Sequence, residues 1–156
     1  MAVRLPGLWG TPRSVLDRWH READATGIIS VTDPEMTRAV ASVEDAASVL
    51  LSFARAPTPG DVVVPSYRAY RLGDLATVIA ELHNARMHVV GPRTGEKQHE
   101  DLIAEEERHF ARLHPAGAVI RFDRRAPGVP ALSSVDLQRF TVDELRELVR
   151  RDRVGV

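Results

Sequence analysis

The stretch Gly91–Glu100 reads GPRTGEKQHE and follows a short apolar run, Met87–Val90. Its glycines and proline predict a loop. Arg93 offers a planar fork of donors that suits a phosphate, and Lys97, the only lysine in the chain, offers a point charge. A loop between a strand and a helix is where α/β proteins often place ligand contacts. Composition alone leaves an ordinary polar turn equally open.

The composition indicates a single globular domain over residues 1–156. This length suits one domain with a sizeable core. Apolar residues make up 44% and charged residues 28% of the chain, which is typical of a folded protein. The net charge of −1 gives no electrostatic reason to expect binding of nucleic acid or an anionic membrane. The absence of cysteine excludes disulfides, thiolate catalysis and cysteine zinc sites.

The sequence shows no segment that is typical of membrane insertion or export. No apolar run approaches the roughly 20 residues that cross a bilayer. The N-terminal MAVRLPGLWG lacks the charged region and long apolar region of a signal peptide. We therefore expect a cytoplasmic location and no membrane partner.

Strand-like and helix-like segments alternate along the chain, which predicts the α/β class. The predicted strands are Ala2–Leu5, Ile28–Val31, Asp61–Pro65, Met87–Val90 and Ala118–Phe122. Apolar residues at helical spacing predict helices over Ser14–Ala25, from Ser42 to before Pro57, over Leu72–His83, over His99–Leu113 and over Thr141–Val149. The second and last of these begin with a capping residue followed by an acid three positions later.

The motifs of dinucleotide binding are absent. No GxGxxG follows a strand and no GxxxxGK[ST] occurs, so we predict no NAD(P) site and no cofactor in this chain. A Tyr-x-x-x-Lys pair is impossible because the position four residues before Lys97 is Arg93. HExxH and GxSxG are absent too, so no catalytic residue can be named.

Seven motifs, taken in order, resemble one family. They are VRLPGLWGTPRSV (Val3–Val15), VTDPEMTR (Val31–Arg38), SVEDAASVL (Ser42–Leu50), GDVVVP (Gly60–Pro65), YRLGDLA (Tyr70–Ala76), GPRTGEKQHE (Gly91–Glu100) and RFTVDELRELV (Arg139–Val149). Together they resemble the C-terminal half of the nucleotide-sugar 4,6-dehydratase/5-epimerase group. These enzymes are extended short-chain dehydrogenases/reductases of polysaccharide biosynthesis.

This resemblance implies a truncated fold. In that family an N-terminal Rossmann half carries the NAD(P) loop and the catalytic lysine. Ala2–Leu5 and Val62–Val64 resemble late strands of that Rossmann sheet, so we expect the substrate domain plus the last strands of the sheet. Loss of the rest would bare these strands, which predicts a homo-oligomer that covers them. A separately encoded Rossmann subunit is the other partner implied.

The resemblance also implies a substrate-binding site formed by Arg38, Arg93, Glu96 and Lys97. The two arginines would meet the pyrophosphate of a nucleotide sugar, and Glu96 would accept hydrogen bonds from ribose hydroxyls. Two guanidinium forks neutralise a diphosphate well. The alternative for Arg38 is a surface arginine before a helix. The family usually has two aromatic residues where Ala39 and Val40 stand, so a wider pocket is expected and the substrate stays open.

Three functions remain open from the sequence. The first is binding of a nucleotide sugar or similar metabolite without redox chemistry, as a binding partner or complementing subunit in sugar or natural-product biosynthesis. The second is a cofactor-free isomerase, lyase or cyclase that uses the widened pocket. The third is a folded remnant without a function.

The histidines do not predict a metal site. Glu106-x-x-His109 has the spacing of a di-iron helix, but such sites need carboxylates from several helices. A solvated helical face explains this pair better. His83 and His88 flank a turn with no partner at ligand spacing.

Two further pairs have a plain and a functional interpretation. Asp33 and Glu35 could serve as an acid and a base, although their proline-containing turn favours ordinary turn chemistry. Trp9 and Trp19 could line a site, although a place in the core or an interface is favoured.

Overall fold

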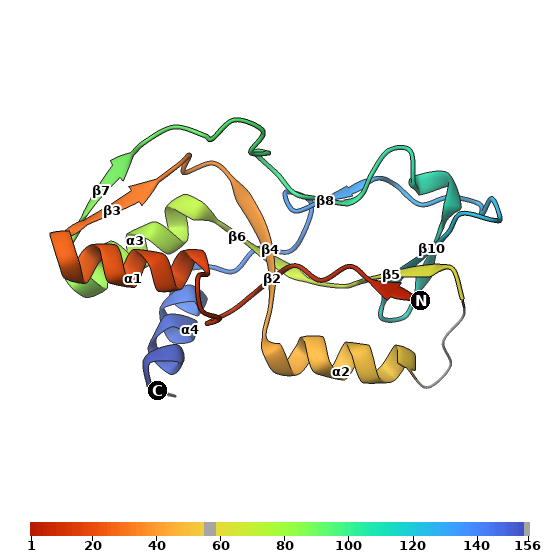
Figure 1. The fold of residues 1–156 in the computed structure, drawn as a ribbon, viewed down its shortest axis with the longest axis horizontal. Coiled ribbons are helices and arrows are strands. Elements are labelled where there is room, and N and C mark those ends of the chain that lie inside the picture. Colours follow the sequence, from red (N-terminus) through yellow and green to blue (C-terminus); the bar gives the residue numbers. More distant parts are fainter. Residues whose placement is uncertain (55–58, 155–156) are drawn as a thin grey trace.

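Two hydrophobic cores organise the chain, and a three-stranded sheet joins them (Figure 1). The computed structural model describes residues 1–54 and 59–154. The joining sheet has the order β2-β4-β6, formed by Gly7–Leu8, Thr37–Ala41 and Arg68–Arg71. Successive side chains of a strand point to opposite faces. Accordingly, Val40 packs in the first core and Ala39 in the second.

The first core lies among helices and a small parallel sheet. Its elements are α1 (Val15–Thr26), β3 (Ile28–Val31), α3 (Leu72–His83), β7 (Arg86–Val89) and α4 (Val142–Val154). Trp19 is fully buried here and donates its indole N–H to the carbonyl of Ser30 at 2.8 Å. Leu75 and Leu145 are also fully buried. Trp19 is therefore a core residue, as the sequence favoured.

The second core lies against a four-stranded sheet of order β1-β5-β10-β9. The strands are Ala2–Val3, Asp61–Pro65, Gly117–Arg121 and Ala111–His114. β1 runs parallel to β5, and β10 runs antiparallel to both of its neighbours. Asp61 and Arg121 face each other in this register and form an ion pair of 2.6 Å. The hydrogen bond from Arg121 holds the pKa of the mostly buried Asp61 carboxyl below its ordinary value.

The remaining elements are one helix, two short strands and a 3-10 turn, and Leu102 and Ile103 among them lie in the second core. These elements are α2 (Val43–Ala54), β8 (Asp101–Ile103), the 3-10 turn η1 (Arg108–Phe110) and β11 (Leu132–Ser133), which pairs with β8. Ser42 caps α2 by accepting the N–H of Asp45, and Thr141 and Glu144 cap α4 reciprocally. These caps have the spacing that the sequence predicts. Among the helices of residues 1–54 and 59–154, none has the length and apolar character needed to cross a bilayer.

The α/β class and most elements are confirmed. The predicted strands Ile28–Val31 and Asp61–Pro65 and the helix Leu72–His83 have the observed bounds. The other confirmed elements differ from the predictions at their ends. β4 and β6 were not predicted, because TRAV and RAYR are short and carry no strong strand pattern. Their antiparallel pairing with each other defines them.

The prediction of a helix over His99–Leu113 is wrong. The segment forms β8, a turn, η1 and β9 instead. Arg4 donates to the carbonyl of Leu102 at 2.5 Å and to both carboxylate oxygens of Glu107 at 2.7 and 2.8 Å. The bond to the Leu102 carbonyl takes a backbone acceptor that a helix would use within its own chain. The Glu106-x-x-His109 pair consequently does not lie on a helix.

The strands expected to be bare differ in their exposure. Val62–Val64 lies in β5, which pairs with β1 on one edge and β10 on the other, so the chain itself covers it. β1 and β9 are the two edge strands of this sheet, so β1 has one free edge. Beside it in Figure 1, α2 extends along the sheet, and Ala46 is its only fully buried side chain among residues 43–53.

Replacing Arg4 with methionine should lower the free energy of unfolding by about 1–3 kcal/mol at neutral pH, because Glu107 and the Leu102 carbonyl lose their donor. The Arg4 hydrogen bond lowers the pKa of Glu107 below its ordinary 4.5. The ionised form is therefore favoured by folding, and this contribution is lost as the pH falls through the folded pKa. Urea unfolding should show a difference between wild type and variant that shrinks below pH 4.5.

The matched control is Arg124→Met, which removes an exposed arginine from the loop after β10. A difference between wild type and Arg4→Met that stays constant with pH, or that Arg124→Met reproduces, would contradict this assignment.

Candidate functional site

A pocket of about 390 Å³ opens beside β4. Its walls come from the loop between β2 and α1, from β4, from α1 and α3, and from the loop Gly91–Glu100. Trp9 and Tyr70 form part of the wall and pack edge to face, with ring centroids 6.1 Å apart. Burial raises the pKa of the Tyr70 hydroxyl strongly, so this residue remains a neutral phenol.

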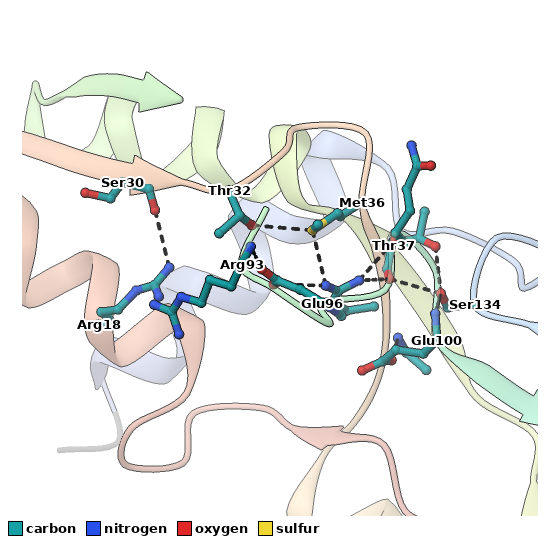
Figure 2. A network of polar contacts seen from close by, with 12 residues as sticks. Arg18, Ser30, Thr32, Met36, Thr37, Arg93, Glu96, Glu100 and Ser134 are labelled. Atoms are coloured by element: carbon teal, nitrogen blue, oxygen red, sulfur yellow. Dashed lines mark hydrogen bonds and ion pairs between the residues drawn. The ribbon is translucent and has the colours of Figure 1, made fainter. Parts of the chain in front are cut away.

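Arg38 lies on β4 and points along the pocket wall, so it is not a surface arginine before a helix. Its Nη1 donates to the carbonyls of Thr37 at 2.8 Å and Gln98 at 3.1 Å. Its Nη2 contacts Sδ of Met36 and Oε1 of Glu96, both at 3.2 Å (Figure 2). Only 17% of the side chain is exposed. Arg38 thus fastens the loop to the strand.

Glu96 closes the loop from the other side. One carboxylate oxygen accepts from Arg38, and the other accepts the backbone N–H of Arg93 at 3.1 Å. The N–H of Glu96 in turn donates to the Arg93 carbonyl at 2.9 Å. The structure therefore brings Arg38, Arg93 and Glu96 to one pocket, as a shared site requires.

Lys97 is not part of this pocket. Its Nζ forms an ion pair of 2.5 Å with Asp101, and 67% of the side chain is exposed. The hydrogen bond to Asp101 raises the pKa of Lys97. Of the four residues that the resemblance implies, Lys97 is the one that the structure places elsewhere, because its exposed side chain pairs with Asp101.

Glu100 is a pocket residue that the sequence interpretation did not single out. Its Oε2 accepts the N–H of Ala39 at 2.8 Å, and burial raises its pKa above the ordinary value. The only available signal was its position at the end of the GEKQHE motif. Ala39 and Val40, which stand where the family usually has aromatic residues, also line the pocket.

A buried polar network supports β4 beneath the pocket. Ser134 is fully buried, donates to the Thr37 carbonyl at 3.0 Å and accepts the N–H of Glu100 at 2.9 Å. The hydroxyl of Thr37 lies 2.7 Å from Oγ of Ser134 and 2.8 Å from Nδ1 of His99 (Figure 2). Because the Ser134 hydroxyl donates its proton to the Thr37 carbonyl, the Ser134 oxygen accepts from the Thr37 hydroxyl. The Thr37 oxygen then accepts from the Nδ1–H of His99. This network fixes Glu100 in place.

The other candidate pairs stay outside the pocket. Asp33 accepts the N–H of Glu35 at 2.8 Å, and Glu35 pairs with Arg71 at 3.2 Å, which is turn chemistry. His83 contacts Asp24 at 2.8 Å through Nδ1 and His20 at 2.7 Å through Nε2. In the part of the chain that the structure describes, no three His, Asp or Glu side chains are grouped to hold a metal ion.

The described residues do not form a dinucleotide-binding turn. Such a turn needs a strand that runs through closely spaced glycines into a helix N-terminus, where the backbone N–H groups meet a pyrophosphate. Here α1 is preceded by Pro12–Ser14, α2 by Ser42, α3 by Arg71 and α4 by Thr141. None of these connections fits the pyrophosphate of NAD(P).

A family model described as "Polysaccharide biosynthesis protein" matches residues 1–121, and the chain belongs to this family. The UDP-N-acetylglucosamine 4,6-dehydratase (inverting) of Campylobacter jejuni is 31% identical over 128 residues, which are 81% of this chain and 35% of that protein. The resemblance that the seven motifs carry is confirmed.

Solved structures show the same fold. Pen from Bacillus thuringiensis superposes with a TM-score of 0.85 and 21% identity, over 97% of this chain and 48% of that one. A second structure is that of TunA, an NAD-dependent NDP-hexosamine 5,6-dehydratase involved in tunicamycin biosynthesis. It superposes with a TM-score of 0.52 and 20% identity, over 62% of this chain and 34% of that one. The chain spans 24% to 40% of the length of three curated relatives.

Proposed function

We propose that the pocket binds the nucleoside diphosphate part of a nucleotide sugar without NAD(P) redox chemistry in these residues. The observation that carries the proposal is the convergence of Arg38, Arg93 and Glu96 on one pocket of suitable size. Guanidinium groups bind phosphate oxygens in pairs, and carboxylates accept from sugar hydroxyls. The name of the Campylobacter relative, which specifies a UDP-sugar, supports this ligand class.

In this proposal the chain acts as a binding partner or complementing subunit in sugar or natural-product biosynthesis. The cofactor-binding half would come from outside residues 1–156, for example as a separately encoded Rossmann subunit. The pocket would then supply the grip on the nucleotide, and the partner would supply the chemistry on the sugar.

Replacing Arg93 with glutamine should weaken binding of UDP about 10- to 100-fold, since a hydrogen bond to a charged group contributes about 1.5–3 kcal/mol. Titration calorimetry with UDP and dTDP measures this. Arg86→Gln, which removes an exposed arginine from β7, is the matched control and should leave the affinity unchanged. Absence of heat with UDP, dTDP and UDP-sugars for the wild-type protein would refute the proposed function.

The second candidate function is a cofactor-free isomerase, lyase or cyclase. The observation that favours it is Glu100, a carboxyl in the pocket whose pKa is raised by burial. Such a group can take a proton from a carbon next to a carbonyl and return it. Incubating the protein with a nucleotide-linked keto sugar in D₂O without NAD(P) should then incorporate deuterium, and Glu100→Gln should abolish incorporation. Equal incorporation with Glu100→Gln or without protein would exclude this role.

We also propose that a second copy of the chain covers α2 and the free edge of β1. Val43, Leu50 and Leu51 of α2 are exposed, and Leu51 has 67% of its surface accessible. A two-fold dimer would bury this apolar patch on both copies at once, because both subunits of such a dimer contribute the same surface.

Leu51→Glu should convert this dimer to a monomer in light scattering at micromolar concentration, because two buried carboxylates would face the interface. Leu113→Glu places the same charge on β9, at an even more exposed leucine, and should leave the dimer intact. A monomeric wild-type protein would contradict the proposed dimer. If a separately encoded Rossmann subunit bound that monomer, the patch would be the surface for this subunit instead.

A further inference from the structure

Arg18 is a pocket residue that neither the motifs nor the resemblance assigns. It lies on α1, and its side chain is part of the pocket wall. Its Nη2 donates to the carbonyl of Ser30 at 3.3 Å, and its Nε lies 3.5 Å from a carboxylate oxygen of Glu22. Ser30 already accepts a shorter bond from Trp19. Within residues 1–54 and 59–154, the other N–H groups of Arg18 have no hydrogen-bond partner.

Arg38, in contrast, has little capacity left for a ligand. Both of its terminal nitrogens are engaged, and its charge is compensated by Glu96 at 3.2 Å. To meet a phosphate through a terminal nitrogen, Arg38 would have to give up one of these four contacts, and loss of the Gln98 carbonyl or Glu96 would weaken the attachment of the loop to β4.

Arg93 has the opposite character. Its backbone is held by Glu96, while its guanidinium forms no ion pair in the described part of the chain. Figure 2 shows the Arg93 side chain extending from the loop on the same side as Arg18, and both residues line the one pocket. The pocket wall holds four arginines and two glutamates, in a chain whose net charge is −1.

Two under-compensated guanidinium groups on one pocket repel each other, and an anion between them removes that repulsion. A phosphate group offers several oxygens, each able to accept from a separate guanidinium fork. We propose that Arg18 and Arg93 form the phosphate clamp of this pocket, while Arg38 positions the loop. This inference rests on the proposed function and specifies which side chains of that site contact the phosphate groups.

The test compares UDP with uridine, which lacks phosphate, by titration calorimetry at low and high salt. Arg18→Gln should weaken UDP binding about 10- to 100-fold, as expected for one hydrogen bond to a charged group. It should also reduce the loss of UDP affinity on adding salt, because one ion contact is gone. Uridine binding should be unchanged. Arg21→Gln, on the exposed face of the same helix, is the matched control and should have none of these effects.

A merely structural role for Arg18 predicts a different outcome. Arg18→Gln would then weaken UDP and uridine equally and leave the salt dependence unchanged, and this result, or wild-type UDP affinity, would overturn the clamp. The proposed function would survive either result as long as the wild-type protein binds UDP.

If Arg18→Gln does not fold, Arg18→Lys should keep the salt dependence and lose part of the affinity, because lysine retains the charge without the fork. Wild-type affinity in Arg18→Lys would contradict a fork contact.

Discussion

The attachment of the loop Gly91–Glu100 to β4 is the constraint on which the pocket depends. Arg38 holds the loop through Gln98 and Glu96, while Glu100 returns a carboxylate to the N–H of Ala39. Because β4 joins the two hydrophobic cores, these bonds place the loop relative to both. A flexible loop would have to be ordered at the moment of binding, and this attachment removes much of that entropic cost.

The attachment also explains why the pocket can hold weakly compensated positive charge. A buried cation needs a nearby negative charge. Arg38 is the most buried of Arg18, Arg38 and Arg93, and Glu96 compensates its charge. Arg18 and Arg93 are more open to solvent, so water can stabilise their charges while no ligand is present. The charge is thus most compensated on the most buried arginine and least compensated on the most exposed one, Arg93, where an anion can reach it from solvent.

Local sequence patterns predicted much of the fold but not its tertiary contacts. Helix α3 and strands β3 and β5 follow from periodicity and β-branched runs, which need no knowledge of distant residues. The helix predicted over His99–Leu113 does not form, and Arg4, far away in sequence, instead binds the Leu102 carbonyl and the Glu107 side chain. For the site, motif resemblance located Arg38, Arg93 and Glu96. Arg18 was missed because one arginine on an amphipathic helix carries no motif, and only the packing of α1 against the pocket distinguishes it.

Arg38 and Arg18 show why residue type and motif do not by themselves define a binding role. Both are arginines in one pocket, and only Arg38 belongs to a family-like motif. The contacts that each already makes separate them: Arg38 contacts four groups, whereas Arg18 makes one hydrogen bond of 3.3 Å and one ion pair of 3.5 Å. A donor that is already satisfied gains little from a phosphate, because binding would exchange one bond for another. A donor that faces solvent exchanges only its hydrogen bond to water for one to a charged phosphate. The unsatisfied side chain is therefore the better contact for the ligand, even where the motif points to its neighbour.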